Sequence, residues 1–470
     1  MQKFAAALGV ALFIATPAAA QTPQPGEAAF RALYKELVET NTTFSAGDCT
    51  LAAQRMATRL KAAGFLDGDL TVFAPPGRPK DGGLVAVYPG KDPKAKAILL
   101  LAHIDVVEAK REDWTRDPFT LIEDDGYFYG RGASDDKAQA AIFTDLLIRY
   151  RQEGFKGRRP IKLALTCGEE GGGHVNGAAW LVANKRELID AAFALNEGAG
   201  VNLDGTGKPI AHTVLAGEKS STSYKLEVTN PGGHSSRPVP DNAIYHLARA
   251  IDRIAGYNFP VMLNDTTRSY FTQMSSIVGG QAGAAMTAIV ANPGDAQAAD
   301  ILRRDPSVNA MLGTTCVATQ LQAGHAGNAL PQRANATINC RIFPGVSGEE
   351  VRDALIKVIG NPVVSVSTAQ GRPGAADAGP PLTPQVMGPI RQVSQAMWPG
   401  VPVVPFLLAA GTDGKALIAG GIPTYGVSGI AYEPDQGYIH GLNERIGVKS
   451  LLDARDFSYR LVKIYASQKD

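Results

Sequence analysis

Ionisable residues recur where apolar, strand-like runs end, and this pattern constrains the fold of the chain most strongly. Three apolar runs, at residues 97–101, 161–165 and 191–195, each lead into such side chains. Runs of this kind are typical of fully buried strands in parallel sheets. Open α/β sheets bind ligands at the carboxyl ends of their strands, so these side chains are expected to converge there. They are His103, Glu169, Glu170 and Glu197.

A chain of 470 residues is too long for one compact core, so we expect two domains. Strand-like runs alternate with segments of helical spacing before residue 217, which predicts an α/β domain with a mixed, mainly parallel sheet. Residues 217–370 change to alternating runs and predict an inserted, smaller α+β lid. A glycine- and proline-rich stretch at residues 371–376 is expected to lead back. The main domain would then comprise residues 21–216 and 371–470.

Residues 1–20 have the features of a secretory signal peptide. Lys3 supplies a positive charge, residues 4–14 are apolar, and residues 18–20 form a small-residue cleavage site before Gln21. The apolar run is shorter than the ~20 residues that a membrane-spanning helix needs. We therefore expect an exported protein, periplasmic or secreted, with no membrane partner after cleavage. A net charge of +1 and the lack of a Lys/Arg block argue against a nucleic-acid partner.

The four cysteines leave the disulfide pattern open. Cys316 and Cys340 lie in strand-like runs at equal distances from a turn centred on Asn328, so they could face each other across an antiparallel hairpin. Two buried free thiols are an equal alternative. Cys167, beside the acidic pair, is expected to be a buried small residue rather than a nucleophile, because no suitable base is evident near it.

Several of the strand-end residues have the chemistry of metal ligands. In a strand, His103 and Asp105 point to one face, and a metal-ligating histidine usually donates its second ring N–H to a carboxylate. A hydrogen-bonded core histidine is the alternative. Asp135, in a glycine-rich turn before a helix, could bridge two metals or simply cap the helix. His440 adds a histidine in a late loop. Four histidines have no comparable context and are taken as structural: His174, His212, His246 and His325.

In their order along the chain, these residues resemble the dinuclear zinc exopeptidases. That family includes aminoacylase, glutamate carboxypeptidase, succinyl-diaminopimelate desuccinylase and carnosinase-type dipeptidases. The resemblance covers nearly the whole mature chain, and its motifs are specific only in combination. They are His103-Ile104-Asp105, residues 114–119, residues 129–137, Glu169-Glu170, Glu197, Gly232-Gly233-His234, Asn328-Ala329-Leu330-Pro331, Gly411-Thr412-Asp413 and His440-Gly441.

The resemblance implies a ligand set for two zinc ions per subunit. One ion would be held by His103, Asp135 and Glu197. The other would be held by Asp135, Glu170 and His440, so that Asp135 bridges the two. Zinc accepts histidine nitrogens and carboxylate oxygens at ~2.0–2.2 Å. Two metals ~3.5–4 Å apart can share a hydroxide and polarise a carbonyl.

The resemblance also assigns roles in catalysis and substrate binding. Glu169 would be the general base that takes a proton from water and returns it to the leaving amine. Asp105 would orient the first histidine ligand. His234, on the lid, would help to stabilise the oxyanion, and Asn328 and Arg341 would bind the carboxylate end of the substrate. Many relatives dimerise through the lid, so a homodimer is implied.

The expected function is that of an exported dinuclear zinc metallohydrolase acting on a small peptide or an N-acyl amino acid. It would cleave an amide beside a free carboxylate, as a carboxypeptidase or aminoacylase, because Glu197 stands where aminopeptidases and dipeptidases of the family have Asp. Lys415 stands where relatives often have Arg, and lysine cannot form a bidentate fork. A dipeptidase or aminopeptidase on the same fold is the alternative. A non-catalytic exported binding protein is a further one, although the base and all five ligand positions are filled.

Overall fold

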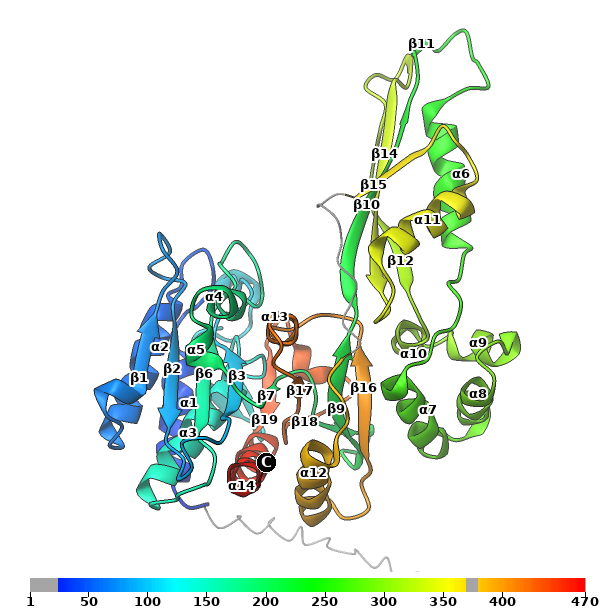
Figure 1. The fold of residues 1–470 in the computed structure, drawn as a ribbon. Helices are drawn as coiled ribbons and strands as arrows, with labels where there is room; N and C mark the ends of the chain where they lie inside the picture. The colour runs from blue at the N-terminus through cyan, green and yellow to red at the C-terminus, as the bar shows by residue number, and fades with distance from the viewer. Residues whose placement is uncertain (1–23, 369–378, 470) are drawn as a thin grey trace, which may run out of the picture.

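The computed structural model describes residues 24–368 and 379–469. Figure 1 shows a central sheet flanked by helices and a long lid that projects away from it. The expected signal peptide and the expected hinge at residues 371–376 lie outside the described residues. Within the described part of the chain, no helix is long and apolar enough to cross a bilayer.

Ten strands of the described residues form the central sheet, in the order β1-β2-β6-β3-β7-β17-β9-β8-β18, with β16 beside β9. The neighbouring strands β6, β3, β7 and β17 run parallel, and so do β16 and β9. The contacts of β1 with β2, of β2 with β6 and of β8 with β9 are antiparallel. This confirms the predicted α/β class with a mixed, mainly parallel sheet. The strands are β1 (Leu70–Phe73), β2 (Gly83–Tyr88), β3 (Ile98–His103), β6 (Ile161–Thr166), β7 (Phe193–Asn196), β8 (Val201–Leu203), β9 (Pro209–Glu218), β16 (Val403–Leu408), β17 (Thr424–Gly426) and β18 (Ala431–Tyr432).

Helices cover both faces of this sheet, which is why its strands are apolar throughout. In β3, Leu100 and Ala102 join the core beneath one helical layer, whereas Leu99 and Leu101 join the core beneath the other. The first layer contains α1 (Glu27–Val38), α2 (Cys49–Ala62), α3 (Lys137–Gln152), α12 (Pro384–Met397) and α14 (Val448–Ser467). The second contains α4 (Gly177–Asn184), α5 (Arg186–Ile189) and α13 (Gly414–Ala419). A small sheet of β4 (Ile122–Asp124), β5 (Tyr127–Tyr129) and β19 (Arg445–Gly447) lies beside them.

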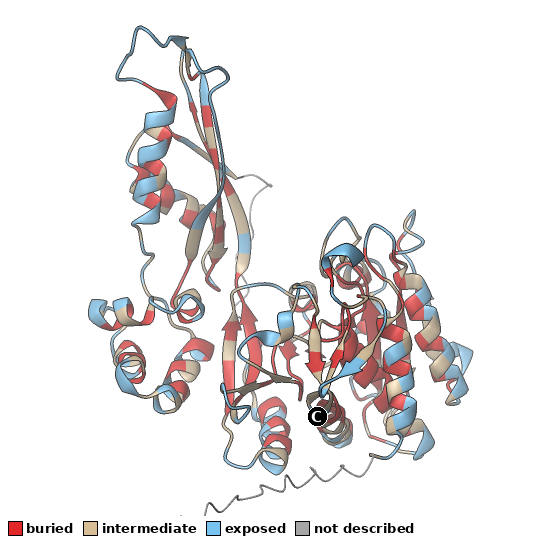
Figure 2. Cartoon of the chain, turned by 180° about the vertical axis from the view of Figure 1, so that it is seen from behind, coloured by how far each residue is buried: buried red, intermediate tan, exposed pale blue. Residues whose placement is uncertain are grey.

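The lid has its own antiparallel sheet in the order β12-β14-β10-β15, with α6 and α11 packed on it around a separate core. At its tip, β11 (Gly233–His234) pairs with β13 (Ala329–Leu330). Figure 2 shows mainly exposed residues at this tip, in contrast to the buried central strands. The lid elements are β10 (Ser220–Thr229), β12 (Thr315–Ala323), β14 (Arg333–Ile342), β15 (Ser365–Thr368), α6 (Ala243–Ala255) and α11 (Gly348–Ile359).

The cap of α6 differs from the expectation. Asp241 begins the segment of helical spacing at residues 241–254, and the sequence predicts it as the cap, but Asn242 caps the helix, because its side-chain oxygen accepts the N–H of Ile244 at 2.9 Å. Asp241 instead accepts hydrogen bonds from Asn230 and His246. Sequence pattern alone does not show which of two adjacent residues with capping side chains will cap a helix. The residue whose backbone is extended just before the first turn becomes the cap.

Four further helices form a layer that the sequence pattern did not separate from the lid. They pack on the edge of the central sheet rather than on the lid sheet, because their core includes Ala211 of β9 and Val404 and Leu407 of β16. Figure 1 shows them beside β16, at the base of the lid. The layer contains α7 (Asp265–Val278), α8 (Gly280–Ala291), α9 (Ala296–Leu302) and α10 (Pro306–Met311).

Two disulfides are present, and the described residues include no free cysteine. Cys316 and Cys340 are register partners on β12 and β14 and are bonded, which decides between the two alternatives left open above. Cys167 is buried, as expected, but it is not a free thiol, because it is bonded to Cys49. The sequence offers no sign of that second pairing, since 118 positions separate its two members.

The core beneath the first helical layer contains a neutral histidine. His212 is fully buried between the rings of Trp398 and Phe457. Its ring nitrogens lie 3.0 Å from the Ser394 hydroxyl and 2.9 Å from the Ser428 carbonyl oxygen. Burial lowers the pKa of His212 from its ordinary value of 6.5 to about 4.

We predict that this histidine makes the fold acid-sensitive. Because its pKa is depressed in the folded state, its contribution to stability is complete above pH 6.5 and is lost as the pH falls through about 4. The loss amounts to about 3 kcal/mol for a shift of this size. Urea unfolding between pH 7 and pH 4 should therefore show a shallower pH dependence for His212→Asn than for the wild type. Parallel pH profiles for the two proteins would contradict this account.

Candidate metal centre

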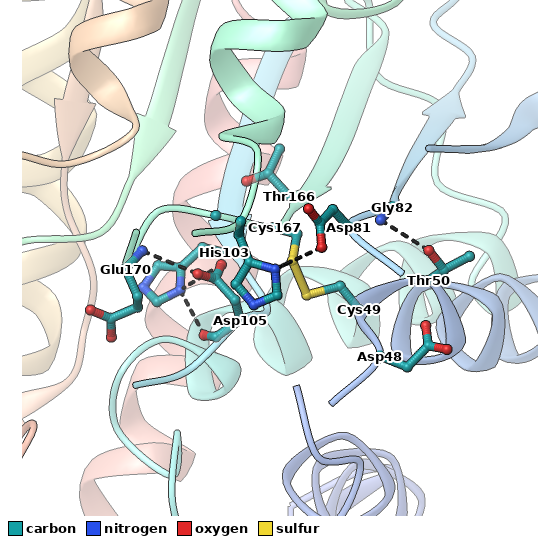
Figure 3. The surroundings of a disulfide bond; sticks show 12 residues. Asp48, Cys49, Thr50, Asp81, Gly82, His103, Asp105, Thr166, Cys167 and Glu170 are labelled. Atoms are coloured by element: carbon teal, nitrogen blue, oxygen red, sulfur yellow. Dashed lines mark hydrogen bonds and ion pairs between the residues drawn. A yellow bond between two sulfur atoms is a disulfide. The ribbon is translucent and has the colours of Figure 1, made fainter. Parts of the chain in front are cut away.

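The residues expected to bind metal lie at the carboxyl edge of the central sheet. The neighbouring strands β6, β3 and β7 run parallel, so their ends meet at one edge. His103 ends β3, Glu169 and Glu170 follow β6, and Glu197 follows β7. Asp135 comes from the turn before α3, and Figure 3 shows His103 with Asp105 and Glu170 at this edge.

Asp135 stands between two histidines. Its Oδ1 lies 3.1 Å from Nε2 of His103, and its Oδ2 lies 3.2 Å from Nε2 of His440. These histidines are more than 300 positions apart in the chain, yet each lies beside a different oxygen of the same carboxylate. This is the arrangement that a carboxylate bridging two metal ions requires.

Each histidine has a second acid beside it. Nε2 of His103 lies 3.8 Å from Oε2 of Glu197, and Nε2 of His440 lies 2.8 Å from Oε1 of Glu170. The structure therefore brings together all five residues of the predicted ligand set, in two groups that share Asp135. Ligand atoms around one tetrahedral zinc ion lie about 3.4 Å apart. The separations observed here are of that size, so the donor set fits two ions.

The ionisable groups of this cluster also favour the binding of a metal ion. Burial raises the pKa of Glu169 to about 8 and holds that of Glu197 well above its usual value. Hydrogen bonds to Asp135 and Glu170 raise the pKa of His440 to about 10. Glu169, Glu197 and His440 thus tend to retain protons, whereas hydrogen bonds from the two histidines outweigh burial and lower the pKa of Asp135. A divalent cation would supply the positive charge that the cluster attracts.

Asp105 acts mainly on the backbone of the acidic pair. Nδ1 of His103 lies 3.0 Å from the main-chain oxygen of Asp105 but 3.6 Å from its carboxylate. The two carboxylate oxygens accept the N–H groups of Glu169 and Glu170 at 3.3 and 3.1 Å. Asp105 therefore holds one histidine ligand through its carbonyl group and orients the segment with the two glutamates through its side chain.

Sequence reasoning missed Glu444, which organises the turn that carries Asp135. The Glu444 carboxylate is buried and accepts the N–H groups of Gly132, Ser134 and Asp135 at 3.1, 2.8 and 3.0 Å. It also pairs with Arg131 at 2.8 Å. Glu444 lies four positions after His440, so one short loop supplies a ligand and fixes the bridging acid. Its place next to a motif histidine was the only signal in the sequence.

Asp413 is a second residue to which the sequence assigned no role. It is buried and accepts hydrogen bonds from the Thr166 hydroxyl at 2.8 Å and from the Asn176 amide at 2.5 Å. These two partners flank the segment that carries Glu169 and Glu170. Asp413 therefore anchors both ends of that segment, which explains why a Gly-Thr-Asp sequence belongs to the pattern.

The three predicted lid residues lie in two places. His234 and Asn328 are exposed at the tip, where Ser235 donates its N–H to the Asn328 carbonyl group. Figure 1 shows β11 at the far end of the lid from the central sheet. Arg341 lies at the base, paired in register with Ser221 near the start of β10. The described contacts of His234 do not include a residue of the metal cluster.

Residues 99–464 match the family model described as Peptidase family M20/M25/M40. The chain belongs to this family. It is 31% identical to a probable carboxypeptidase S-like 2 of Dictyostelium discoideum over 390 residues, which cover 81% of this chain and 74% of the relative. It is also 31% identical to N-fatty-acyl-amino acid synthase/hydrolase PM20D1 of Xenopus tropicalis over 385 residues, 80% of this chain and 73% of that protein.

A solved structure has the same fold. The M20 family metallo-carboxypeptidase Sso-CP2 from Sulfolobus solfataricus superposes with a TM-score of 0.67 at 19% identity, covering 93% of this chain and 99% of that one. M20 proteins are metal-dependent and typically dinuclear. This chain is accordingly an M20 metallopeptidase or amidohydrolase, and its cluster contains groups of histidines and carboxylates that could hold a metal ion.

The shared carboxylate leads to a prediction about metal content. We expect two zinc ions per wild-type chain, one in His440→Ala and none in Asp135→Ala, because only the aspartate contributes to both groups. Asp136→Asn is the matched control. Burial raises the pKa of Asp136 well above its usual value, so the amide resembles the native neutral acid, and this variant should keep both ions. Elemental analysis after dialysis measures the ratio, and equal loss in His440→Ala and Asp135→Ala would contradict the bridging role.

Proposed function

We propose that this protein is an exported dinuclear zinc hydrolase that cleaves an amide beside a free carboxylate, with Glu169 as the general base. The main support for this proposal is the position and the hydrogen bonding of the Glu169 side chain. It lies within reach of His103 and Glu197, in a group whose ligand atoms are all within 4.8 Å of one another. Within residues 24–368 and 379–469, its carboxylate accepts no hydrogen bond from the protein, so it is free to accept one from water.

The proton path follows from this arrangement. Two bound zinc ions would supply a nucleophilic water at neutral pH and would polarise the scissile carbonyl group. Glu169 takes a proton from the attacking water at a carboxylate oxygen and returns it to the nitrogen of the leaving amine. Burial raises the pKa of this carboxyl group in the metal-free protein, and two bound cations would lower it, which leaves an ionised carboxylate to accept the proton.

The proposed substrate class is supported by the names of two relatives and by two cationic side chains at the base of the lid. One relative is named as a carboxypeptidase and another as a hydrolase of N-fatty-acyl amino acids, and both kinds of substrate carry a free carboxylate beside the scissile amide. Arg341 and Lys415 lie near each other at the base of the lid, and Lys415 is also within electrostatic reach of Glu169. We assign the substrate carboxylate to Arg341, with Asn328 contributing from the lid tip of a second copy of the chain.

The position of His234 supports a dimer. The lid strands β10 and β14 each have ten residues, which corresponds to about 33 Å. A side-chain rotation cannot bring His234 from the tip of such a sheet to the metal cluster of its own chain. We propose that the lid pairs with that of a second copy and that His234 stabilises the oxyanion in the partner's site.

Both disulfides support export, because such bonds form and persist in oxidising compartments. Zinc is proposed as the metal because the ligand set consists of imidazole nitrogens and carboxylate oxygens.

The central test is Glu169→Gln, assayed together with its metal content. The variant should retain two zinc ions and lose roughly 10²–10⁴-fold in kcat, the usual contribution of a general base. The substrate panel should contain N-acyl amino acids, N-blocked dipeptides and free dipeptides. Cleavage of blocked substrates supports the proposal, and cleavage of free dipeptides alone would assign the protein as a dipeptidase. Unchanged turnover in the variant would exclude Glu169 as the base.

Subunit mixing tests the shared site. Glu169→Gln and His234→Ala chains should each be inactive as homodimers. If His234 acts in the partner's site, a mixed dimer has one complete site, and statistical exchange restores about a quarter of wild-type activity. If His234 acts within its own chain, neither site of the mixed dimer is complete and no activity returns. Light scattering on the same samples reports whether the protein is a dimer.

A further inference from the structure

The segment that carries Glu169 and Glu170 is unusually flexible by composition. Four of its glycines adopt left-handed φ angles between +64° and +110°, namely Gly168, Gly171, Gly172 and Gly173. Glycine loses more conformational freedom on folding than any other residue, so an unsupported segment of this kind would sample many conformations. A general base and a metal ligand must be held to within a fraction of an ångström. External contacts must therefore restrain this segment.

One restraint is covalent. The disulfide joins Cys167, immediately before the first of these glycines, to Cys49, the first residue of α2. Both cysteines are fully buried. The N–H of Cys49 donates to the Lys80 carbonyl oxygen at 3.0 Å, which ties the helix end to the neighbouring loop. Figure 3 shows this bond beside His103 and Glu170.

A second restraint comes from the same loop. Asp81 is buried, and its two carboxylate oxygens lie 2.8 Å from Nδ1 of His174 and 3.1 Å from the backbone nitrogen of Val175. Nδ1 of His174 also lies 3.7 Å from Sγ of Cys167. The Cys167 carbonyl oxygen accepts the N–H of Gly177 at 2.7 Å and closes the base of the segment. The disulfide and Asp81 thus hold the two ends of the glycine-rich turn against one loop.

We propose that the Cys49–Cys167 disulfide is a positioning element for Glu169 and Glu170, so that zinc affinity and turnover depend on its oxidation. The part that concerns turnover rests on the hydrolase function proposed above, whereas the part that concerns zinc affinity does not. Without the bond, the glycine-rich segment loses its covalent link to α2 and depends on hydrogen bonds alone.

The second disulfide provides an internal control. Cys316 and Cys340 join strands β12 and β14, which are already paired along their length in the lid. Removing that bond leaves the contacts of the metal cluster untouched. Redox sensitivity of the metal centre should therefore follow the first disulfide and not the second.

The experiment uses two double-serine variants of the mature chain. Cys316→Ser with Cys340→Ser leaves only the Cys49–Cys167 pair. This protein is purified reduced and then oxidised with glutathione disulfide. The two thiols form one S–S bond and lose two protons, while glutathione disulfide accepts the two electrons and becomes two glutathione thiols. Cys49→Ser with Cys167→Ser cannot form the bond and serves as the permanently open form.

Zinc affinity is measured by competition with a chromophoric chelator, and kcat and KM are measured on the substrate panel. We expect oxidation to tighten the weaker zinc site about 10–100-fold, the usual effect of contacts that orient a ligand. We expect kcat to rise about 10²-fold, as for a reacting group brought back by about 1 Å, with KM little changed. The Cys49→Ser, Cys167→Ser protein should match the reduced form and should not respond to the oxidant.

Three outcomes would overturn the proposal. The first is equal zinc affinity and equal kcat in the reduced and oxidised forms. The second is a response to oxidant that persists without Cys49 and Cys167. The third is loss of the whole fold on reduction, seen by circular dichroism, because the bond would then be a general stabiliser. If oxidised wild type binds two zinc ions but cleaves no substrate of the panel, the proposed function fails, while the redox dependence of zinc affinity still tests the positioning role.

Discussion

Several carboxylates gathered in one partly buried cluster repel each other unless positive charge neutralises them, and the rest of the structure depends on this constraint. The parallel strands β6, β3 and β7 bring the acids together at one edge, and Asp135 is placed so that each oxygen faces a different histidine. The geometry is useful only when cations are bound. The metal affinity and the catalytic role that we propose for Glu169 would therefore both follow from the same arrangement.

A second set of buried acids keeps the ligands in place without binding metal. Each accepts hydrogen bonds from a segment that carries or flanks a ligand, and each comes from a different part of the chain. These acids are Asp81, Asp105, Asp413 and Glu444. Backbone and side-chain donors compensate these carboxylates, so they can remain buried. The ligands thus lie on loops whose conformations are determined by distant residues.

The α/β class and the meeting of His103, Glu170 and Glu197 at one sheet edge could be predicted from local pattern, whereas Asp135 and His440 entered the predicted ligand set through the family resemblance. Buried strands are apolar throughout, and the ionisable residues that follow them meet wherever parallel strands end. Features that depend on pairing between distant segments could not be predicted. The bond between Cys49 and Cys167 has no local signal, nor does the contact between Glu444 and the turn of Asp135. The layer of α7–α10 has helical spacing, but only the three-dimensional structure shows that it packs on β16.

The central claim is that one carboxylate joins two metal sites, and anomalous diffraction tests it most directly. Crystals of the zinc-loaded protein would be measured above and below the zinc absorption edge. We expect two peaks about 3.5–4 Å apart, one on each side of Asp135, next to His103 and next to His440. A single peak, or a second peak that Asp135 does not contact, would contradict it.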